Sequence, residues 1–356
     1  MTIPATQQHT NIPYLDGWRG VAILMVLLGH FGPAKYWYTG RLGVVLFFVL
    51  SGLFMGRLLF VRKVPLSAFF AKRITRIVPA LWVYVLAMWF YAAYIQPAPY
   101  RATAYDFFAV LSFSSTYLSS IWEVQWPVGQ LWSLNVEEHS YVFLALGALA
   151  IAKLGGRLSA PVFLVATTLA VMACTALYMS GIWQVEGSPW RTRSEVASLG
   201  LMASAAFCAW SERPRQHAAS VVRVSAWLPL GALIVALVSF LPRGPVFWNF
   251  SILVAPVLAA FAVNHAAQFP ELIKRILGAR VLRWFGTCSF SIYLWQGPFY
   301  NATKQFGASP TLCLASGVLA GALSYYFIEN PARLYLNAKW DAYQSGRKAL
   351  AFTPAN

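Results

Sequence analysis

Residues 17–34 read GWRGVAILMVLLGHFGPA, an apolar run long enough to cross a bilayer that nevertheless contains Arg19 and His30. The rest of the 356-residue chain is similar, with 59% hydrophobic residues, 11% charged residues and a mean hydropathy of +0.58. A soluble domain carries about 25% charged residues, so this chain lacks the polar side chains that a water-facing surface needs. The composition excludes a cytosolic enzyme, a disordered protein and a secreted disulfide scaffold, and it indicates a membrane protein.

Ten apolar runs have about the length of a membrane-spanning helix. They lie at 17–34, 41–61, 77–96, 137–154, 159–180, 195–211, 224–241, 247–266, 285–300 and 311–328. A further run at 107–121 is shorter and rich in serine, which favours an interfacial or re-entrant segment. We therefore expect an all-α polytopic membrane protein, a bundle of about ten transmembrane helices within residues 1–336, followed by a short cytoplasmic tail at 337–356.

The basic residues predict how this bundle is oriented. With the amino terminus inside, the cytoplasmic segments hold 19 Lys and Arg residues and the outer segments hold seven, which follows the positive-inside rule. Ten spans then place both termini in the cytoplasm. The net charge of +16 has the same origin, because basic loops meet anionic lipid head groups, and we expect no nucleic-acid partner. The polar residues 1–13 contain no Lys or Arg, so we expect no cleavable signal peptide.

Arg19 and His30 share one predicted helix, where an ionisable side chain costs roughly 2.5 kcal/mol or more and needs a partner or a function. Their spacing of 11 residues is three turns plus about 20°, so both project from one face, about 16 Å apart along the axis. Imidazole can take a proton from a hydroxyl or act as a nucleophile, and guanidinium binds phosphates or carboxylates. The alternatives are a structural histidine and an arginine that snorkels to the membrane rim.

A second cluster stands in GQLWSLNVEEHSY at 129–141, where Glu137, Glu138 and His139 open a predicted helix. Carboxylates in a first turn stabilise a helix through its dipole, so helix capping is one explanation. The functional alternative is a carboxylate that orients an imidazole or accepts a hydrogen bond from a sugar hydroxyl. Adjacent residues lie about 100° apart on a helix, so only one of the two glutamates can face a given partner.

Two further groups of charges flank predicted helices. Arg73 and Arg76 precede the third helix, either as topology determinants or as a phosphate site for a nucleotide-bearing donor. Glu329 is expected to end the tenth helix before Pro331. A carboxylate is unfavourable at the carboxyl end of a helix, so we expect a cationic partner for it, such as Arg333.

Several common sites are missing from the sequence. It contains no metal-ligand set, P-loop, GxSxG elbow or dinucleotide fingerprint, so we expect no metal and no bound cofactor. The cysteines lie inside apolar runs without CxxC pairing, which is typical of small buried hydrophobic residues rather than of a metal site or disulfides. They are Cys174, Cys208, Cys288 and Cys313.

Four motifs, in this order, resemble those of the acyltransferase 3 family of integral-membrane acyltransferases, which includes bacterial O-acetylases of surface polysaccharides. They are YLDGWRGVAILMVLLGHF at 14–31, GVVLFFVLSGLFMG at 43–56, KRITRIVPALW at 72–82 and GQLWSLNVEEHSY at 129–141. SIYLWQ at 291–296 and IENP at 328–331 match weaker signatures. The resemblance covers about residues 14 to 336.

The resemblance implies a role for each motif residue. It implies that His30 is the catalytic base or acyl carrier, that Glu137 is an essential carboxylate, and that Arg19 with the Arg73/Arg76 pair engages the phosphates of acyl-CoA or a paired acidic residue. Glu138 is expected beside Glu137 at the catalytic site. The residues expected on the substrate side are Asp16, Ser51, Arg73, Arg76, Trp132, Ser133 and Glu329.

The chain departs from the family pattern at three places. Val45 stands where an acidic residue is common, so any ion pair of that acid is absent here. His139 and Ser140 replace the usual Gln and Phe that follow the second glutamate. Gln296 stands where the late signature often ends in His, so the proton role of that histidine is not carried over.

These features predict a multi-pass acyltransferase of the bacterial inner membrane. It would move an acyl group, above all acetyl, from acyl-CoA to a hydroxyl of a saccharide or glycosylated acceptor, as in cell-surface polysaccharide O-acetylation, with acetyl-CoA as co-substrate. A transporter or flippase of a lipid-linked saccharide would also need buried charges. A non-catalytic membrane scaffold would tolerate the loss of His30.

Overall fold

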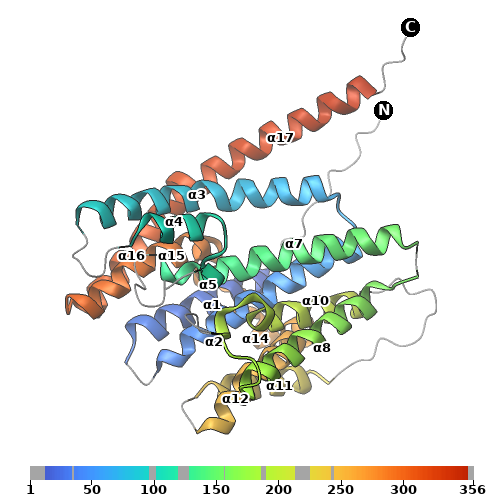
Figure 1. Ribbon diagram of the computed structural model, residues 1–356, viewed down its shortest axis with the longest axis horizontal. Helices are drawn as coiled ribbons and strands as arrows, with labels where there is room; N and C mark the ends of the chain where they lie inside the picture. Colours follow the sequence, from blue (N-terminus) through green and yellow to red (C-terminus); the bar gives the residue numbers. More distant parts are fainter. Residues whose placement is uncertain are drawn as a thin grey trace.

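The computed structural model describes residues 13–33, 36–95, 102–118, 128–155, 157–185, 190–212, 225–241 and 244–351. Within these ranges every regular element is a helix, which confirms the predicted all-α fold. Figure 1 shows the long helices arranged as a bundle, with the far end of α17 (Asn330–Ala351) extending away from it.

The helices follow the apolar runs of the sequence. The first half of the chain forms α1 (Pro13–Phe31), α2 (Trp37–Met55), α3 (Leu66–Tyr94), α4 (Ala104–Leu111), α5 (Ser115–Leu118), α7 (Trp132–Lys153) and α8 (Ala160–Met179). The second half forms α9 (Ser194–Ala197), α10 (Leu199–Ser211), α11 (Trp227–Ser239), α12 (Pro245–Leu253), α13 (Ala255–Asn264), α14 (Glu271–Leu277), α15 (Arg280–Gln305), α16 (Pro310–Ser324) and α17. Two π-helical segments, η2 (Gly56–Val61) and η6 (Tyr325–Glu329), continue α2 and join α16 to α17. The 3-10 turns are η3 (Gly129–Leu131), η4 (Trp190–Thr192) and η5 (Ala266–Gln268).

Within the described ranges, four helical stretches are long and apolar enough to cross a membrane. They are Tyr38–Val61, Leu66–Tyr94, Ala160–Met179 and Pro310–Gly346, and a pair bent by 43°, Val246–Leu253 with Ala255–Asn264, is a fifth candidate. The long helices α1, α7 and α15 fall outside this set, and they carry most of the polar motif residues. The apolar helices support a membrane protein, whereas the count of ten spans and the cytoplasmic placement of both termini stay predictions.

Each of the ten predicted runs overlaps a helix or a broken pair of helices. The serine-rich run at 107–121 forms two short helices, α4 and α5, and α4 begins with a capping box between Thr103 and Asp106. Parts of several predictions lie outside the described residues. These are the segment 1–12, positions 34, 96, 119–121 and 224, the tail end 352–356, and the loop residues Lys35, Arg101, Arg213, Arg215, Arg223 and Arg243.

Two predicted helix ends are wrong. Helix α7 begins at Trp132, so Glu137 and Glu138 stand in its second turn, beyond the reach of the dipole argument that made capping an alternative. The chain also remains helical through Pro331, because η6 leads directly into α17. A π turn bonds across five residues, as from the Asn330 amide to the Tyr325 carbonyl, and proline is tolerated at the start of the next helix.

Helix α1 packs against α2 and against α15, and glycines make the second contact close. A Cβ atom on Gly286 of α15 would lie 1.9 Å from the backbone oxygen of Asp16, and one on Gly20 of α1 would lie 2.0 Å from that of Leu282. Small residues let helix backbones approach in this way, and such contacts are common in membrane bundles. The glycines therefore bring the polar residues of α1 and α15 within hydrogen-bond distance.

Candidate functional site

A stripe of polar residues on α15 faces α1 and α7. Ser289, Tyr293, Gln296 and Tyr300 are spaced by four, three and four residues, which places them on one face of a helix. Ser289 and Gln296 are fully buried. The sequence analysis missed three of the four, although this spacing within an apolar run was a readable signal of a buried polar face.

His30, near the carboxyl end of α1, is held by this stripe. Its Nδ1 lies 2.7 Å from Oε1 of Gln296, and its ring stacks on Tyr300 with centroids 4.3 Å apart and planes inclined by 18°. Lys304 has its Nζ 5.6 Å from the centroid of the Tyr300 ring. The imidazole therefore faces the bundle interior in a fixed orientation.

The contacts of Gln296 select the tautomer of His30. The Gln296 Nε2 donates to the backbone oxygen of Tyr293 at 3.4 Å, which leaves Oε1 directed at the imidazole. An amide oxygen only accepts, so Nδ1 of His30 carries the hydrogen and donates it. Nε2 of a neutral imidazole is then the unprotonated nitrogen, the form required of a base or a nucleophile.

Arg19 lies toward the other end of the same face of α1. It donates to Oγ of Ser289 at 3.0 Å, so Arg19 and His30 both contact α15, as their spacing predicts. Electrostatic interactions link Arg19 to Glu329, Asp16 and Glu137, but within the described residues no carboxylate reaches ion-pair distance from it.

The two glutamates of α7 face different partners, as their adjacent positions require. Glu137 accepts a hydrogen bond from Ser51 of α2 at 2.7 Å. Glu138 forms an ion pair with Arg73 of α3 at 2.8 Å, with the two side chains 18% and 16% exposed. Neither glutamate orients His30, a role that the sequence analysis offered for one of them and that Gln296 fills.

Arg73 is held on a second side by an aromatic ring. Its Cζ lies 3.4 Å from the centroid of the Tyr141 ring, which is buried. A guanidinium with both a carboxylate and a ring face is well compensated, since a cation over an aromatic ring gains about 0.5 to 2 kcal/mol. Arg73 thus pairs with an acidic residue, one of the two roles expected of it.

Arg76 has different surroundings from Arg73. It interacts electrostatically with Arg19, which repels it, and with Glu329, which attracts it. Glu329 is buried at the end of η6 and accepts a hydrogen bond from Ser291 of α15 at 2.6 Å. The predicted partner Arg333 instead donates to Asn330 at 2.8 Å, so the cationic neighbours of Glu329 are Arg19 and Arg76.

Ser133 joins α7 to this site, and the neighbouring Trp132 packs edge-on against Phe48 of α2. The hydroxyls of Ser133 and Tyr293 lie 2.7 Å apart, and Tyr293 also donates to the backbone oxygen of Gln130. The side chain of Gln130 donates to the backbone oxygen of Leu294 at 3.2 Å. Pro298 lacks the amide that would otherwise bond this oxygen, so Gln130 compensates for the proline in α15.

His139 lies apart from His30. Its Nδ1 is 2.8 Å from Oγ of Ser194, and its ring approaches Tyr117. Tyr117 donates to Glu195, which also accepts from Arg193 at 2.8 Å. Within the described ranges, no three His, Cys, Asp or Glu side chains gather as a metal ion would require.

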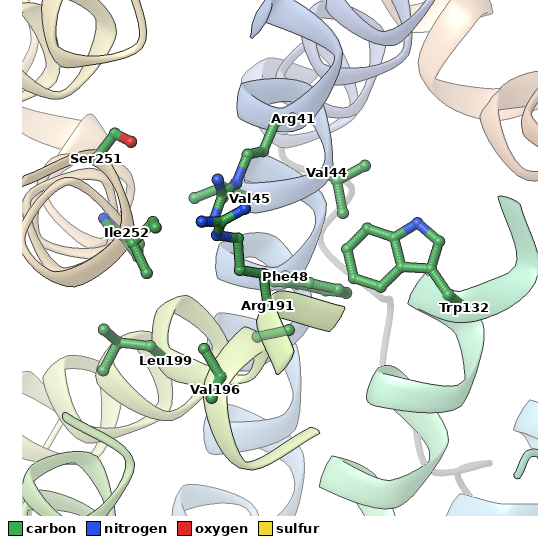
Figure 2. Close-up of a pocket in the computed structure, with 12 residues that line it drawn as sticks. Arg41, Val44, Val45, Phe48, Trp132, Arg191, Val196, Leu199, Ser251 and Ile252 are labelled. Atoms are coloured by element: carbon green, nitrogen blue, oxygen red, sulfur yellow. The ribbon is translucent and has the colours of Figure 1, made fainter. Parts of the chain in front are cut away.

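A pocket opens beside this site and is lined by residues of α2, α7, η4, α9, α10, α12 and α13 (Figure 2). Trp132 and Val45 line it, together with Arg41 and Arg191, whereas His30 does not. Val45, where the resemblance led us to note a missing acid, thus contributes an apolar wall to this pocket.

Comparison with known proteins shows which family shares this arrangement. A family model described as an acyltransferase domain matches residues 12–328. The chain belongs to the acyltransferase 3 family. The match includes every motif that carries Arg19, His30, Arg73 and the two glutamates of α7.

Curated relatives of this acyltransferase 3 chain are O-acetyltransferases by name. The peptidoglycan O-acetyltransferase OatA of Listeria monocytogenes is 24% identical over 358 residues, covering 90% of this chain and 56% of the relative. The O-acetyltransferase OatA of Staphylococcus aureus is 25% identical over 370 residues, covering 96% of this chain and 59% of the relative. The chain therefore spans a little over half the length of these relatives. No solved structure matches this acyltransferase.

Proposed function

We propose that this chain is an O-acetyltransferase of the bacterial inner membrane, with ten spans and both termini in the cytoplasm. It would transfer acetyl from acetyl-CoA to a hydroxyl of a saccharide acceptor of the peptidoglycan type. Family membership and the names of the relatives support acetyl transfer over transport of a lipid-linked saccharide. The arginines of the site, which are suited to bind phosphate groups, support acetyl-CoA as the co-substrate.

The observation that carries this proposal is the hydrogen bond of 2.7 Å between His30 and Gln296. It leaves Nε2 of His30 with a free electron pair, in a position fixed by the Tyr300 ring. We infer that Nε2 removes the proton of the acceptor hydroxyl while its oxygen attacks the thioester carbonyl carbon. The C–S bond then breaks, an ester forms, and the imidazolium returns the proton to the departing thiolate. Proton transfer by a positioned side chain contributes about 10²- to 10⁴-fold to a rate.

Two guanidinium groups lie away from His30, those of Arg19 on α1 and Arg76 on α3, and they support an anionic donor. Arg19 and Arg76 lie close enough to repel each other, and the buried carboxylate of Glu329 attracts both. Arginine binds phosphate groups through paired N–H donors. A nucleotide held there would direct its acyl arm along α1 toward His30, about 16 Å away.

The proposal is tested by acetyl transfer from labelled acetyl-CoA to peptidoglycan fragments in membranes. His30→Ala and His30→Gln are expected to lower turnover at least about 100-fold, because both remove the base. His265→Ala is the matched control, since His265 directly follows α13, its Nδ1 bonds the Phe261 backbone oxygen, and its ring packs on Phe261 away from the site. Wild-type turnover by a well-inserted His30 variant would reject the mechanism. Absence of labelled product from acetyl-CoA with the wild-type protein would reject acetyl-CoA as the donor.

A further inference from the structure

Two arginines converge on the pocket beside α2. Figure 2 shows the guanidinium groups of Arg41, from α2, and Arg191, from η4, pointing toward one another. The walls around them are apolar and include Phe48, Trp132 and Ile252. Two cations thus line a pocket whose other walls are apolar except for Ser251.

Neither arginine has a carboxylate partner in the part of the chain that the structure describes. The ion pairs there involve Arg57, Arg73 and Arg193 with glutamates, and Lys274 with Glu271. Arg41 and Arg191 instead each lie 4.9 Å from the centroid of the Trp248 ring, and they repel each other. A ring face attracts a cation but supplies no net negative charge, so an anion between the two guanidiniums would relieve the repulsion.

The pocket adjoins the His30 end of the bundle. Arg41 directly follows Gly40, whose position in α2 is so close to α1 that a Cβ atom there would lie 3.9 Å from Cδ2 of His30. Trp132 opens α7, the helix that carries Glu137. The proposed donor charges are Arg19, in the half of α1 away from His30, and Arg76 of α3, which interacts with Arg19. The second pair of guanidiniums is therefore placed for the other substrate.

We propose that Arg41 and Arg191 form an anion-binding subsite for a carboxylate or phosphate group of the acceptor saccharide. This inference rests on the proposed acetyl transfer. Each guanidinium presents a fork of N–H donors that matches a carboxylate or phosphate, and the half-buried ring of Trp132 offers an apolar surface beside it for the sugar ring. The subsite gives this acyltransferase a preference for an acceptor that carries a negative charge.

The test compares two peptidoglycan-derived disaccharides, one with a free carboxylate and one with that carboxylate amidated. Acetyl transfer gives kcat and KM, and equilibrium binding of each disaccharide to the purified protein gives Kd independently of turnover. The variants are Arg41→Gln, Arg191→Gln and Arg41→Lys, which keeps the charge but loses the fork. Arg62→Gln is the matched control, because Arg62 is exposed and follows η2, which continues α2 at the end away from Arg41.

Wild-type protein and Arg62→Gln are expected to bind the charged disaccharide about tenfold more tightly than the amidated one. In Arg41→Gln and Arg191→Gln this ratio falls toward one, and Arg41→Lys lies between. An unchanged ratio in the glutamine variants, or equal affinity for both disaccharides in wild type, overturns the subsite. Displacement by phosphatidylglycerol alone, with no effect of acceptor charge, would assign the pocket to a lipid head group instead. Charge-dependent binding without acetyl transfer would retain the subsite and reject the proposed reaction.

Discussion

Replacement of Gln296 by leucine tests how the site holds His30. Gln296 is fully buried, and its Oε1 accepts the hydrogen of Nδ1 at 2.7 Å. Leucine fills a similar volume but accepts nothing, so the imidazole N–H loses its partner. An unsatisfied polar group of this kind costs about 1 to 3 kcal/mol. The His30 ring can avoid this cost by rotating or by adopting the other tautomer, and either change moves the basic nitrogen out of position. We therefore expect kcat to fall about 5- to 150-fold, since 1.4 kcal/mol corresponds to a factor of ten.

The assay is transfer from labelled acetyl-CoA, with kcat and the KM for acetyl-CoA measured separately. A positioning role predicts a loss in kcat with little change in that KM, because Gln296 is not near Arg19 or Arg76 in the proposed donor site. Gln296→His restores an acceptor nitrogen and is expected to recover activity relative to Gln296→Leu. Gln305→Leu makes the same chemical change at the carboxyl end of α15 and serves as the control.

One result would refute this reasoning. If Gln296→Leu, correctly inserted and as stable as wild type, turned over at the wild-type rate, the tautomer of His30 would not matter. Nε2 would then not be the reacting nitrogen, and the hydrogen bond at 2.7 Å would serve packing alone.

Other predictions distinguish charges that stabilise the fold from charges that bind substrate, and test the close contact between α1 and α15. Arg73→Gln is expected to lower the free energy of unfolding in detergent by about 3 kcal/mol because it leaves the largely buried Glu138 unpaired. Arg73→Met combined with Glu138→Leu should cost less than the sum of the single changes. Arg76→Gln should instead raise the KM for acetyl-CoA about tenfold with little change in the thermal midpoint, a pattern that inhibition of transfer by free CoA can confirm. Gly286→Val should prevent α1 and α15 from packing and abolish both folding and transfer, whereas Gly231→Val, with open space around it, should do neither. Equal stability of these two glycine variants would contradict the close approach.

The features that depend on local spacing could be predicted from the sequence. The 11-residue separation of Arg19 and His30 is enough to place them on one face, and both contact α15. The adjacent positions of Glu137 and Glu138 are enough to exclude a shared partner. These predictions held because helix geometry alone determines them.

The features that depend on two distant segments could not be predicted. The partner of His30 lies 266 positions away, and the sequence analysis treated Gln296 only as a departure from a motif. The prediction that the tenth helix ends at Pro331 was wrong because the π segment η6 leads into a new helix that tolerates the proline. The local sequence does not distinguish such a continuation from a helix end. We predicted the start of α7 too late because Ser133 and Asn135 interrupt the apolar run. Both are buried, so the inward face of this helix is partly polar.

The arrangement of the arginines explains why one motif carries two roles. Arg73 and Arg76 are three residues apart, and the sequence analysis predicts a shared role for them. Arg73 is compensated by Glu138 and the ring of Tyr141, so its charge holds α3 to α7. Arg76 interacts with Arg19 instead, and this repulsion is only partly offset by the attraction of Glu329. Arg41 has a similar unfavourable interaction with Arg191, so a bound anion would offset the repulsion in both pairs, in line with the binding roles that we propose for them.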